Sequence, residues 1–549
     1  MKTYFGSHPP GSHLIKQAYD DLFSSPPGIV ALDVETVSLK DRRVLGIGIA
    51  TPANDSFFFD IFDTGMPWHL IQPSPTKKVW HNAPFDLSWE VLGKFGADIE
   101  NIEDSIILTR MMPAIPNELR YASQFVQTQT EDMGDVLARG GVTRVIDLPW
   151  LVVAEKCCRD ALATMQVFLK LRPQVSTEYY ETERKFLVKL MKMSHKGIKL
   201  DKLRVEEIDR ELEANLTIFM GTAQSLGFNP RSPEQVAIVM NSLGYILPTN
   251  KDTGRPMTGE ETLEHIPEPE AQLTILARKY SKLHGTYVHK WLKKDRAFTQ
   301  FKTDAVTGRT TSSGENLQNI PTGQRRGDIV PEAGSIRSCF IPDTPEGTKW
   351  DCSQIEYRVL AYLSQDKEMM AIFDDPLRNI HRETQHALKL TSYIDSKTFG
   401  FAMVYGGDNA VISKNTGIQD LARIEEFKRG WRLKFPQAWD WIVTQQAEGL
   451  RTLRVRTMFG RELNLTDTPQ AMSEKHLRNC AVNWPIQGTA AELFKRVINA
   501  LDTVIPIGDL LSQTHDDSWT NGVHEIPKEV EHLSPLWTPI EVEHVRRFG

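Results

Sequence analysis

The sequence predicts a multidomain protein in which an α/β domain is followed by an α+β domain. At 549 residues the chain is longer than one hydrophobic core usually organises. Apolar β-forming residues alternate with turn residues over 29–50, whereas apolar residues over 178–225 recur at helical spacing. This change of pattern places a domain boundary near residues 172–180, after Arg172 and Pro173.

The N-terminal part is expected to contain strands with covering helices. Ile29 to Ala50 has the composition of two adjacent strands. Helical patterns follow at Phe85 to Phe95 and at Arg159 to Leu171. After the boundary, one apolar helical face comprises Leu187, Leu190 and Met191.

Strand and helix signals return in the C-terminal half. A strand ending at Asp351 leads into a helix over Ile355 to Leu363. Leu510 to Ser518 predicts a hairpin that carries acids at its turn. Further helices are expected over Asp395 to Tyr405 and Ala490 to Leu501.

The composition is that of a soluble globular protein. The chain is 40% apolar and 25% charged, and its apolar runs are too short to cross a bilayer. Met1 to Leu14 has no continuous apolar stretch, so we expect no secretory signal and a cytoplasmic location. The five cysteines show no C-x-x-C spacing, which argues for reduced thiols rather than a structural zinc site.

Positive charge is concentrated in two stretches, although the net charge is −7. Between Arg278 and Arg296, seven Lys or Arg residues and three aromatic residues accompany a single acid, Asp295. The second stretch contains Arg451, Arg454, Arg456 and Arg461. Such stretches suit the neutralisation of phosphates, and a solvated helix face explains the same pattern equally well.

Four acids in the N-terminal part have the character of a two-metal site for hydrolysis. Asp33 and Glu35 lie on one face of a strand, because side chains alternate with a period of two. Asp86, and Asp160 at an expected helix start, would complete an oxygen-rich site that suits divalent metals. A lone D-x-E is more often a pair of solvated acids, so the order and context of all four acids decide.

A second acidic pair lies in the C-terminal half. Asp351 at a strand end and Asp516 at the hairpin, with Asp517 as a secondary acid, suit two metals about 3.5–4 Å apart, as nucleotidyl transfer requires. Between them, one helical face with a spacing of four carries Lys397, Phe401 and Tyr405. Core packing explains the two aromatic residues, but it does not explain the Lys, which suits a triphosphate.

The N-terminal acids resemble the DEDD 3′→5′ exonuclease domain of family A DNA polymerases. The resemblance covers about residues 28–172. The family's D-x-E, N-x-x-x-D and final Asp are matched here by Asp33, Glu35, Asn82, Asp86 and Asp160. The family's Tyr four residues before the last Asp is replaced by Lys156. We therefore expect an exonuclease that is active but weak.

Five motifs over about residues 183–549 resemble the polymerase domain of the same family. D-Y-S-Q-I-E-L-R corresponds to Asp351–Arg358, K-x-x-x-F-x-x-x-Y-G to Lys397–Gly406, and V-H-D-E to Thr514–Asp517. The other two signatures match at Thr307–Arg309 with Asn316–Pro321, and at Asn483–Glu492. Agreement of five independent motifs in the family's order is far more specific than any one of them.

The resemblance implies a role for each matching residue. Asp351 and Asp516 would bind two Mg²⁺ ions, with Mn²⁺ as an alternative, and each of the two sites would hold such a pair. Glu356 would be the steric gate that excludes ribonucleotides. Contacts to the incoming dNTP are implied for Lys397, His381, Phe401 and Tyr405. Contacts to primer-template DNA are implied for Arg309, Asn316, Gln318, Asn483 and Gln487, with His515 beside the primer end.

The implied fold is an RNase H-like exonuclease domain over 1–177 and a right-hand polymerase domain over 178–549. Its thumb, palm and fingers correspond to about 178–297, 298–364 with 454–549, and 365–453. We expect no N-terminal 5′-nuclease domain, and in this respect the chain resembles bacteriophage members of the family. A phage-encoded protein would be located in the host cytoplasm. We expect a monomer that acts in DNA replication and proofreading and does not bind a membrane. A helicase, a primase or a processivity factor would be further partners.

Two departures and two alternatives accompany this resemblance. The family's Arg four residues before the helical Lys is replaced by Tyr393, and we expect Arg382 to supply the missing charge. Phe401 in place of Tyr implies discrimination against dideoxynucleotides.

Two other functions are alternatives to this one. A single-subunit RNA polymerase is disfavoured by Glu356 and by the exonuclease fold. A DNA-binding protein without catalysis is disfavoured because all the palm acids are present.

Overall fold

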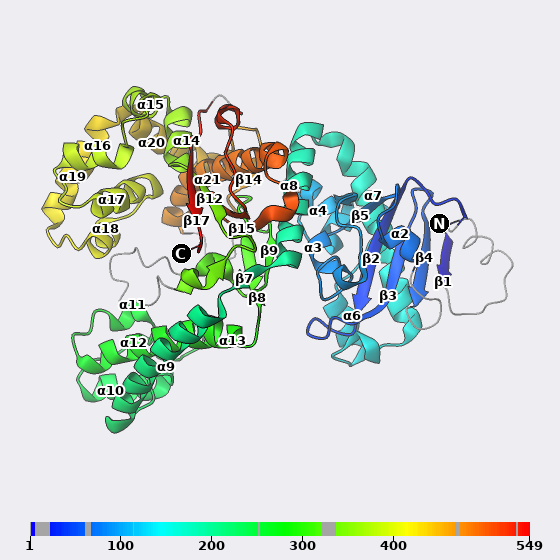
Figure 1. Cartoon of the computed structure of the whole chain (residues 1–549), viewed down its shortest axis with the longest axis horizontal. Coiled ribbons are helices and arrows are strands. Elements are labelled where there is room, and N and C mark those ends of the chain that lie inside the picture. Colours follow the sequence, from blue (N-terminus) through cyan, green and yellow to red (C-terminus); the bar gives the residue numbers. More distant parts are fainter. Residues whose placement is uncertain are drawn as a thin grey trace.

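The computed structural model describes the whole chain except residues 1, 6–21, 23, 61–66, 113–114, 251–252, 321–335, 467–472, 534–535 and 549. Figure 1 shows an N-terminal sheet domain at the right, a central body built on a second sheet, and a helical arm at the lower left. Pro321 of the predicted Asn316–Pro321 signature lies outside the described residues. Within the described ranges, no helix combines the length and apolar character needed to span a membrane.

The N-terminal domain is a six-stranded sheet in the order β1-β4-β3-β2-β5-β6. Its strands are β1 (Lys2–Phe5), β2 (Ile29–Thr36), β3 (Val44–Ala50), β4 (Asp55–Asp60), β5 (Lys77–Trp80) and β6 (Ile102–Asp104). The two strands predicted over 29–50 are confirmed and pair antiparallel. Two short helices, α2 (Trp68–Ile71) and α3 (Ala83–Asp86), lie between strands of this sheet. Three more follow its last strand: α4 (Ser105–Arg110), α5 (Leu119–Ala122) and α6 (Met133–Gly140).

Two helix predictions in this domain are wrong. The single helix expected over 85–95 is α3, a turn and a 3-10 helix over Gly93–Phe95. Leu87 and Val91 are both buried, so their spacing of four indicates core packing rather than a continuous helix. Asp160 does not begin a helix but lies near the middle of α7 (Trp150–Leu171), which starts early because Val153 and neighbouring residues already pack into the core.

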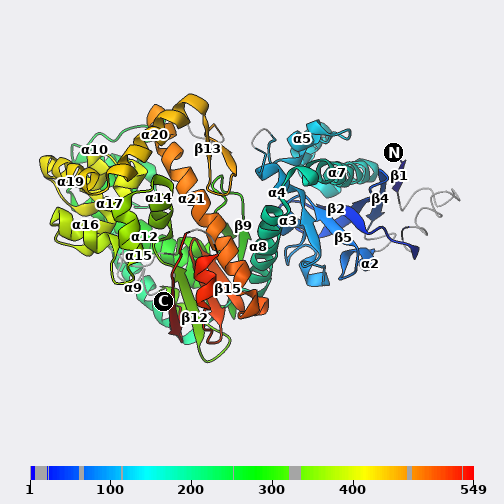
Figure 2. The same cartoon turned by 90° about the horizontal axis from the view of Figure 1, so that it is seen from above.

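Helix α8 (Thr177–Lys196) joins the N-terminal domain to the central body (Figure 2). Its Leu187 and Met191 belong to the core of the N-terminal domain, whereas Leu190 packs into the core of the central body. Helix α8 therefore has two buried faces, whereas the sequence pattern predicted one apolar face. The Tyr180 hydroxyl accepts a hydrogen bond from Asp104 N at 3.0 Å, which fixes one side of this joint.

The helical arm spans residues 202–291. Its outer part has a core of its own, whereas its base shares a core with residues of the central body such as Phe340 and Trp519. It consists of α9 (Lys202–Ser225), α10 (Pro233–Ser242), α11 (Glu260–Leu263), α12 (Pro269–Leu283), a π-helical turn (His284–Val288) and α13 (His289–Trp291). Tyr280, Tyr287 and Trp291, the aromatic residues of the first basic stretch, are buried in the arm. They stabilise the arm rather than present a stacking surface.

The central body surrounds a four-stranded sheet in the order β15-β16-β12-β17. Its strands are β12 (Gly347–Cys352), β15 (Leu510–Thr514), β16 (Asp517–Asn521) and β17 (Ile540–Val545). The predicted strand-to-helix passage is confirmed, with α14 (Ile355–Ser364) directly after β12, and so is the hairpin of β15 and β16. The helix expected over 490–501 is the last part of the much longer α21 (Glu474–Ala500), which continues through Pro485.

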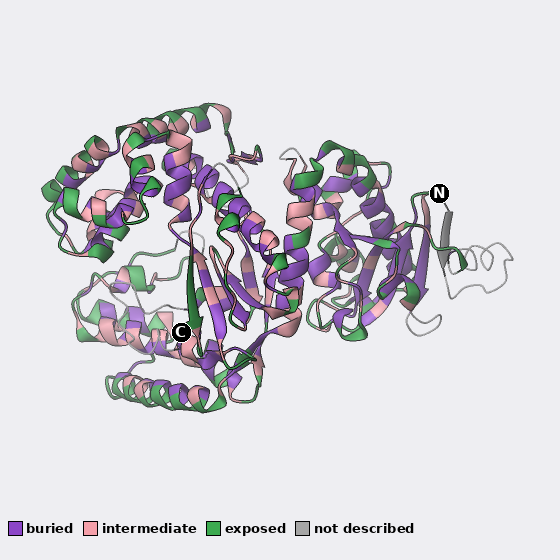
Figure 3. Cartoon of the chain, turned by 45° about the horizontal axis from the view of Figure 1, so that its top comes forward, coloured by how far each residue is buried: buried purple, intermediate pink, exposed green. Residues whose placement is uncertain are grey.

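A group of outer helices lies at the far left of Figure 1. They are α15 (Lys367–Asp374), α16 (Ile380–Leu388), α17 (Tyr393–Tyr405), α18 (Asn409–Thr416) and α19 (Leu421–Lys434), and α20 (Pro436–Thr452) returns the chain to the sheet. Short strands complete the chain: β7 (Ile198–Leu200), β8 (Arg296–Ala297), β9 (Thr299–Lys302), β10 (Thr311–Gly314), β11 (Phe340–Ile341), β13 (Arg454–Arg456) and β14 (Glu462–Asn464). Buried residues follow the N-terminal sheet, most of the central sheet and the helices against them, whereas the edge strand β17 is largely exposed (Figure 3).

Candidate functional site: two acidic clusters

Acids from distant parts of the chain meet at one end of the central sheet. Asp351 near the end of β12 is the register partner of Asp517 at the start of β16. Cys352 N donates a hydrogen bond to Asp516 O at 3.0 Å, which fixes the turn beside β12. His515 in this turn has a φ of 57°, so the hairpin reverses sharply and carries Asp516 to the sheet end. Asp351 and Asp517 therefore lie on neighbouring strands with Asp516 in the turn beside them, and the catalytic role of these acids stays a prediction.

Burial and mutual repulsion disfavour ionisation of these acids. Burial, followed by the charges of Asp516 and Asp517, raises the pKa of Asp351 to about 8. Burial also raises the pKa of Asp517 to about 7 and that of Asp516 above its ordinary value. Among the described residues, Asp517 Oδ1 is buried without a hydrogen-bond partner. Unpaired carboxylate oxygens in one place are what a hard divalent cation needs, so this donor set fits two such ions.

Glu356, the predicted steric gate, is held from both sides. Arg309 forms an ion pair with its Oε1, and the Tyr405 hydroxyl donates a hydrogen bond to its Oε2. Gln487 in turn forms a hydrogen bond with Tyr405. Four predicted site residues from four separate motifs thus form one continuous chain of polar contacts. Such a chain leaves the Glu356 side chain little rotational freedom.

The helical face predicted from Lys397, Phe401 and Tyr405 lies on α17, and it carries two packed aromatic rings and one exposed charged side chain. The rings of Phe401 and Tyr405 stack with centroids 5.8 Å apart, while Lys397 on the same face is exposed. His381 is 3% exposed and lies edge-on to the Tyr357 ring, with centroids 5.2 Å apart. Burial, and then the charge of Lys397, lowers the pKa of His381 to about 4, so a neutral ring is available here.

A cavity of about 410 Å³ opens beside the stacked rings, between α17, α18 and α21. Gly406 ends α17 with a φ of 73°. A Cβ atom at this glycine would lie 2.2 Å from Asn479 Oδ1 on α21. Only a glycine therefore allows α17 to end so close to α21.

The residues predicted to contact DNA line up on the neighbouring elements. Asn483 and Gln487 are one turn apart on α21 and are both partly exposed, and Asn483 Oδ1 has no hydrogen-bond partner among the described residues. Asn316 Oδ1 accepts a hydrogen bond from Ser312 Oγ at 2.7 Å. Gln318 Nε2 donates to Gln513 O at 3.0 Å and so reaches the acidic hairpin. His515 is exposed next to the acids.

Sequence reasoning missed three residues at this site. Gln513, which is 2% exposed, donates from Nε2 to His515 O at 2.7 Å, and its Oε1 accepts a hydrogen bond from Thr310. The two side chains hold the acidic turn in place. Glu541 on β17 is the other register partner of Asp351. No motif singles out any of them, and only the position of Gln513 beside the acidic turn gave a usable signal.

The four N-terminal acids also come together. Asp33 and Glu35 on β2, Asp86 at the end of α3 and Asp160 on α7 line one cavity of about 1040 Å³, together with Asn82. Burial, then the charge of Asp160, raises the pKa of Asp33 to about 7. Burial and the charge of Asp33 also raise the pKa values of Glu35 and Asp86. This oxygen-rich set again fits divalent cations, although its role stays a prediction.

Two further side chains occupy this N-terminal cluster, and sequence reasoning overlooked both. The Thr130 hydroxyl donates a hydrogen bond to Asp160 Oδ1. Cys157 Sγ donates to Asp33 O at 3.3 Å, and one ligand atom each of Asp33, Glu35 and Cys157 lies within 4.8 Å of the others. Lys156, where the resemblance expects a Tyr, forms an ion pair with Asp160. The cavity thus already contains a cation of the protein itself.

Many of the basic side chains in the two stretches are bonded to other residues of the chain. Arg296 pairs with Asp343, Lys294 with Glu315 and Lys279 with Glu260, while Arg278 donates to backbone oxygens. In the second stretch Arg454 and Arg456 both pair with Glu462, Arg451 pairs with Glu448, and Arg461 is buried. Within the first stretch, Lys282, Lys290 and Lys293 are exposed and have no side-chain partner among the described residues.

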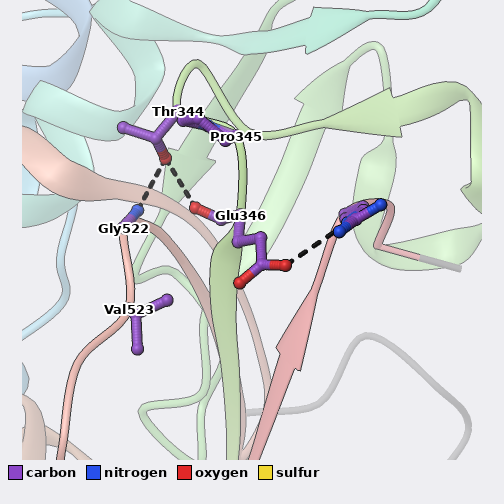
Figure 4. A pocket seen from close by; sticks show the side chains of 6 residues that line it. Thr344, Pro345, Glu346, Gly522 and Val523 are labelled. Carbon is purple, nitrogen blue, oxygen red and sulfur yellow. Dashed lines mark hydrogen bonds and ion pairs between the residues drawn. The ribbon is translucent and has the colours of Figure 1, made fainter.

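A separate pocket lies at the other end of β12 and contains none of the predicted site residues (Figure 4). Its polar groups satisfy one another. Thr344 Oγ1 donates to Glu346 O at 2.7 Å and accepts from Gly522 N at 2.8 Å, and Glu346 pairs with Arg546. This pocket therefore offers no free group for chemistry.

Comparison with known proteins gives concordant matches. The family model described as DNA polymerase family A matches residues 201–534. The thermostable DNA polymerase I of Thermus filiformis is 31% identical over 437 residues, which cover 71% of this chain and 50% of that protein. DNA polymerase I of Pseudomonas aeruginosa is 27% identical over 569 residues, which cover 92% of this chain and 61% of that protein. The chain spans about half the length of the first of these relatives.

A solved structure shares the fold over almost the whole chain. It is the POL domain of Pol1 from M. smegmatis in complex with DNA primer-template and dNTP. Its TM-score is 0.69 at 20% sequence identity, and the match covers 94% of this chain and 95% of that one. The predicted multidomain fold, an α/β domain followed by the right-hand arrangement, is thereby confirmed.

Proposed function

The chain belongs to DNA polymerase family A, and we propose that it is a DNA-directed DNA polymerase that extends a primer 3′ end with dNTPs. One observation carries the proposal. Asp351 near the end of β12 and Asp516 in the turn between β15 and β16, which are far apart in the sequence, come together beside a Glu356 held by Arg309 and Tyr405. This juxtaposition supports nucleotidyl transfer on deoxynucleotides in particular.

Divalent metal ions are the cofactors that membership of this family implies, and we propose Mg²⁺, with Mn²⁺ as an alternative. Asp351 and Asp516 would hold them, with Asp517 as the secondary acid. When bound, such ions lower the pKa of the attacking hydroxyl and neutralise charge on the triphosphate. The protein's own contribution is a rigid, largely buried set of carboxylates whose raised pKa values fall once cations are present.

The residues around the acids would bind the nucleotide and the DNA. Exposed Lys397 and the buried, neutral His381 would contact the triphosphate, and Phe401 would stack near the base. Arg382 lies 5.4 Å from the ring centre of Tyr393, at the place of the family's missing Arg, and so would add a phosphate contact. Primer-template would be read through the minor groove by Arg309, Asn316, Gln318, Asn483 and Gln487, since acceptors there are nearly alike for all correct pairs.

The polymerase part of the chain would have the right-hand arrangement of thumb, palm and fingers. We assign the arm and its neighbourhood, about 178–297, to the thumb, with Lys282, Lys290 and Lys293 on the DNA backbone. The central sheet would be the palm (298–364 and 454–549) and the outer helices the fingers (365–453). Closure of α17 over a correct nucleotide would complete the site. Within replication we expect a monomer that works beside a helicase, a primase and a processivity factor.

A second activity is favoured by the N-terminal cluster. Its four acids at one cavity support a 3′→5′ exonuclease over residues 1–177 that proofreads the primer end. The Lys at position 156 makes us expect weak activity, because no tyrosine is available to orient the attacking water.

The test is extension and degradation of one labelled primer-template by four proteins: wild type, Asp351→Ala, Asp33→Ala and Glu529→Ala. Glu529 is exposed and forms no side-chain bond with any described residue, so it is the matched control. Asp351→Ala should abolish extension with dNTPs, while Asp33→Ala should abolish only degradation. Extension with rNTPs as readily as with dNTPs would favour an RNA polymerase. No extension by wild type with Mg²⁺ would favour a DNA-binding protein without catalysis.

A further inference from the structure

The wall of the N-terminal acidic cavity carries a nearly buried positive charge, that of Lys156. Lys156 precedes Asp160 by one turn of α7, so the two side chains lie on one face of the helix. The Lys156 ammonium forms an ion pair with Asp160, and both side chains are nearly buried, at 8% and 11% exposure. The positive charge also lowers the pKa values of Asp33 and Glu35 against the effect of burial.

The arginines on the wall of this cavity are engaged elsewhere, and Lys40, which also lines it, is exposed. Arg120 pairs with Glu118, Arg144 with Asp147, and Arg110 donates to Thr303. Lys156 is thus the one described cation on the cavity wall that pairs with a predicted metal ligand. Four carboxyl groups and the Lys156 ammonium group line the same cavity, so a divalent ion finds oxygen ligands there but must compete with Lys156 for them.

We propose that the Lys156 ammonium occupies the cation position of the N-terminal site and competes with divalent metal ions for Asp33, Glu35 and Asp160. An ammonium group and a metal ion require the same carboxylate oxygens, so metal binding must first break the ion pair with Asp160. The displaced ammonium then stays close to the metal as a like charge. This inference rests on the exonuclease part of the proposed function. If it holds, the expected exonuclease activity is weak because metal binding at this site is weak.

Metal binding, rather than activity, tests the inference most directly. Mn²⁺ is titrated into the full chain and followed by electron paramagnetic resonance, with Asp351→Asn in every protein to weaken the polymerase site. Lys156→Met should bind Mn²⁺ at the N-terminal site at least about tenfold more tightly than the parent. Lys170→Met is the matched control, because it removes a charge from the same helix where Lys170 is exposed and bonded only to Phe125 O. It should leave the affinity unchanged.

Thermal stability supplies a second readout. Without metal, Lys156→Met leaves the acids uncompensated and should lower the Tm, and Mn²⁺ should raise the Tm more in this variant than in the parent. Lys156→Gln, which keeps a polar side chain, serves if the methionine variant does not fold. Equal Mn²⁺ affinity in the parent and in either folded variant would overturn the inference, as would a smaller Mn²⁺-induced rise in Tm.

Degradation of a single-stranded oligonucleotide separates this inference from the exonuclease proposal. Faster degradation by Lys156→Met than by the wild type supports both. Tighter Mn²⁺ binding without degradation by either protein supports competition by Lys156 and overturns the exonuclease. Full-rate degradation by the wild type at micromolar Mn²⁺, unaltered in Lys156→Met, supports the exonuclease and overturns the competition.

Discussion

The two acidic clusters of this chain are both built from buried carboxyl groups, and they differ in the positive charge that lies next to those groups. At the central sheet, Asp517 Oδ1 has no hydrogen-bond partner among the described residues, and Lys349 Nζ lies 4.0 Å from Asp517 Oδ2. In the N-terminal cavity, Lys156 is in direct contact with Asp160. One site is therefore open to an external cation, whereas the other already contains an internal one.

The comparison teaches that a carboxylate motif does not by itself specify a working metal site. Both clusters have acids from distant segments, and burial raises the pKa of an aspartate in each. The neighbours differ: a Lys one helical turn from Asp160, and a rigid hairpin next to Asp351. Counter-charge and rigidity, rather than the number of acids, should decide how strongly each site works.

The largest expected effect separates the two sites. Asp351→Asn should lower the rate of dNTP incorporation about 10³-fold, because the proposed metal-binding carboxylate of the polymerase site is lost. Asp33→Asn should leave that rate within about twofold of the wild type. Single-turnover primer extension measures both, and equal losses in the two variants would remove the distinction between the sites.

The next effect concerns rigidity at the central site. Glu356→Ala should raise incorporation of rNTPs relative to dNTPs by about 10²-fold, because the side chain that crowds the 2′ position is gone. Tyr405→Phe keeps Glu356 but removes one of its two fixed contacts, and it should give a smaller rise. The ratio of kcat/KM for dCTP and CTP is the measurement. An unchanged ratio in Glu356→Ala would show that another residue is the gate.

A smaller effect is expected at the outer helices. Arg382→Ala should raise the KM for dNTPs about fivefold, since one partly screened phosphate contact is lost. Arg429 is also exposed on an outer helix, and Arg429→Ala should have no effect. Steady-state extension with a single dNTP measures the KM. If Arg382→Ala matches the wild type, the missing Arg is not replaced by Arg382.

The smallest effect is on stability. The folded-state pKa values of Asp351 and Asp517, about 8 and about 7, lie above their ordinary value near 3.8. The folded protein therefore binds more protons than the unfolded chain between about pH 4 and pH 8, and its stability falls as the pH rises through this window. Metal-free Tm should drop by a few degrees from pH 5 to pH 8, and Mg²⁺ should restore it at pH 8. Asp351→Asn should flatten this dependence.

Local signals predicted the elements that carry the chemistry. The strand before Asp351, the hairpin before Asp517 and the helix with Lys397 all occur where short-range patterns indicated them. Their patterns are strong because each element has one clearly buried side and a turn or cap at its end. The meeting of Asp351 with Asp516 depends on contacts across 165 residues of chain, so the residue pattern offered the two acids only as candidates, and the resemblance to a family supported their pairing.

Other features could not be predicted because they depend on tertiary packing. Helix α8 is buried on two faces, since it packs against two domains, and a single-sequence pattern cannot distinguish this from one wide face. Leu87 and Val91 pack into the core without a continuous helix. The contact of Lys156 with Asp160 follows from their spacing, but its place inside a cavity of acids becomes evident only when β2, α3 and α7 come together.

The central claim is that Asp351 and Asp516 act as a single unit in DNA synthesis. The most direct measurement is the single-turnover rate of one correct dNTP addition by wild type, Asp351→Asn, Asp516→Asn and the double variant. If the two carboxylates share the same metal ions, the double variant should be no slower than the slower single variant. Losses that multiply in the double variant, or full speed in either single variant, would contradict the account.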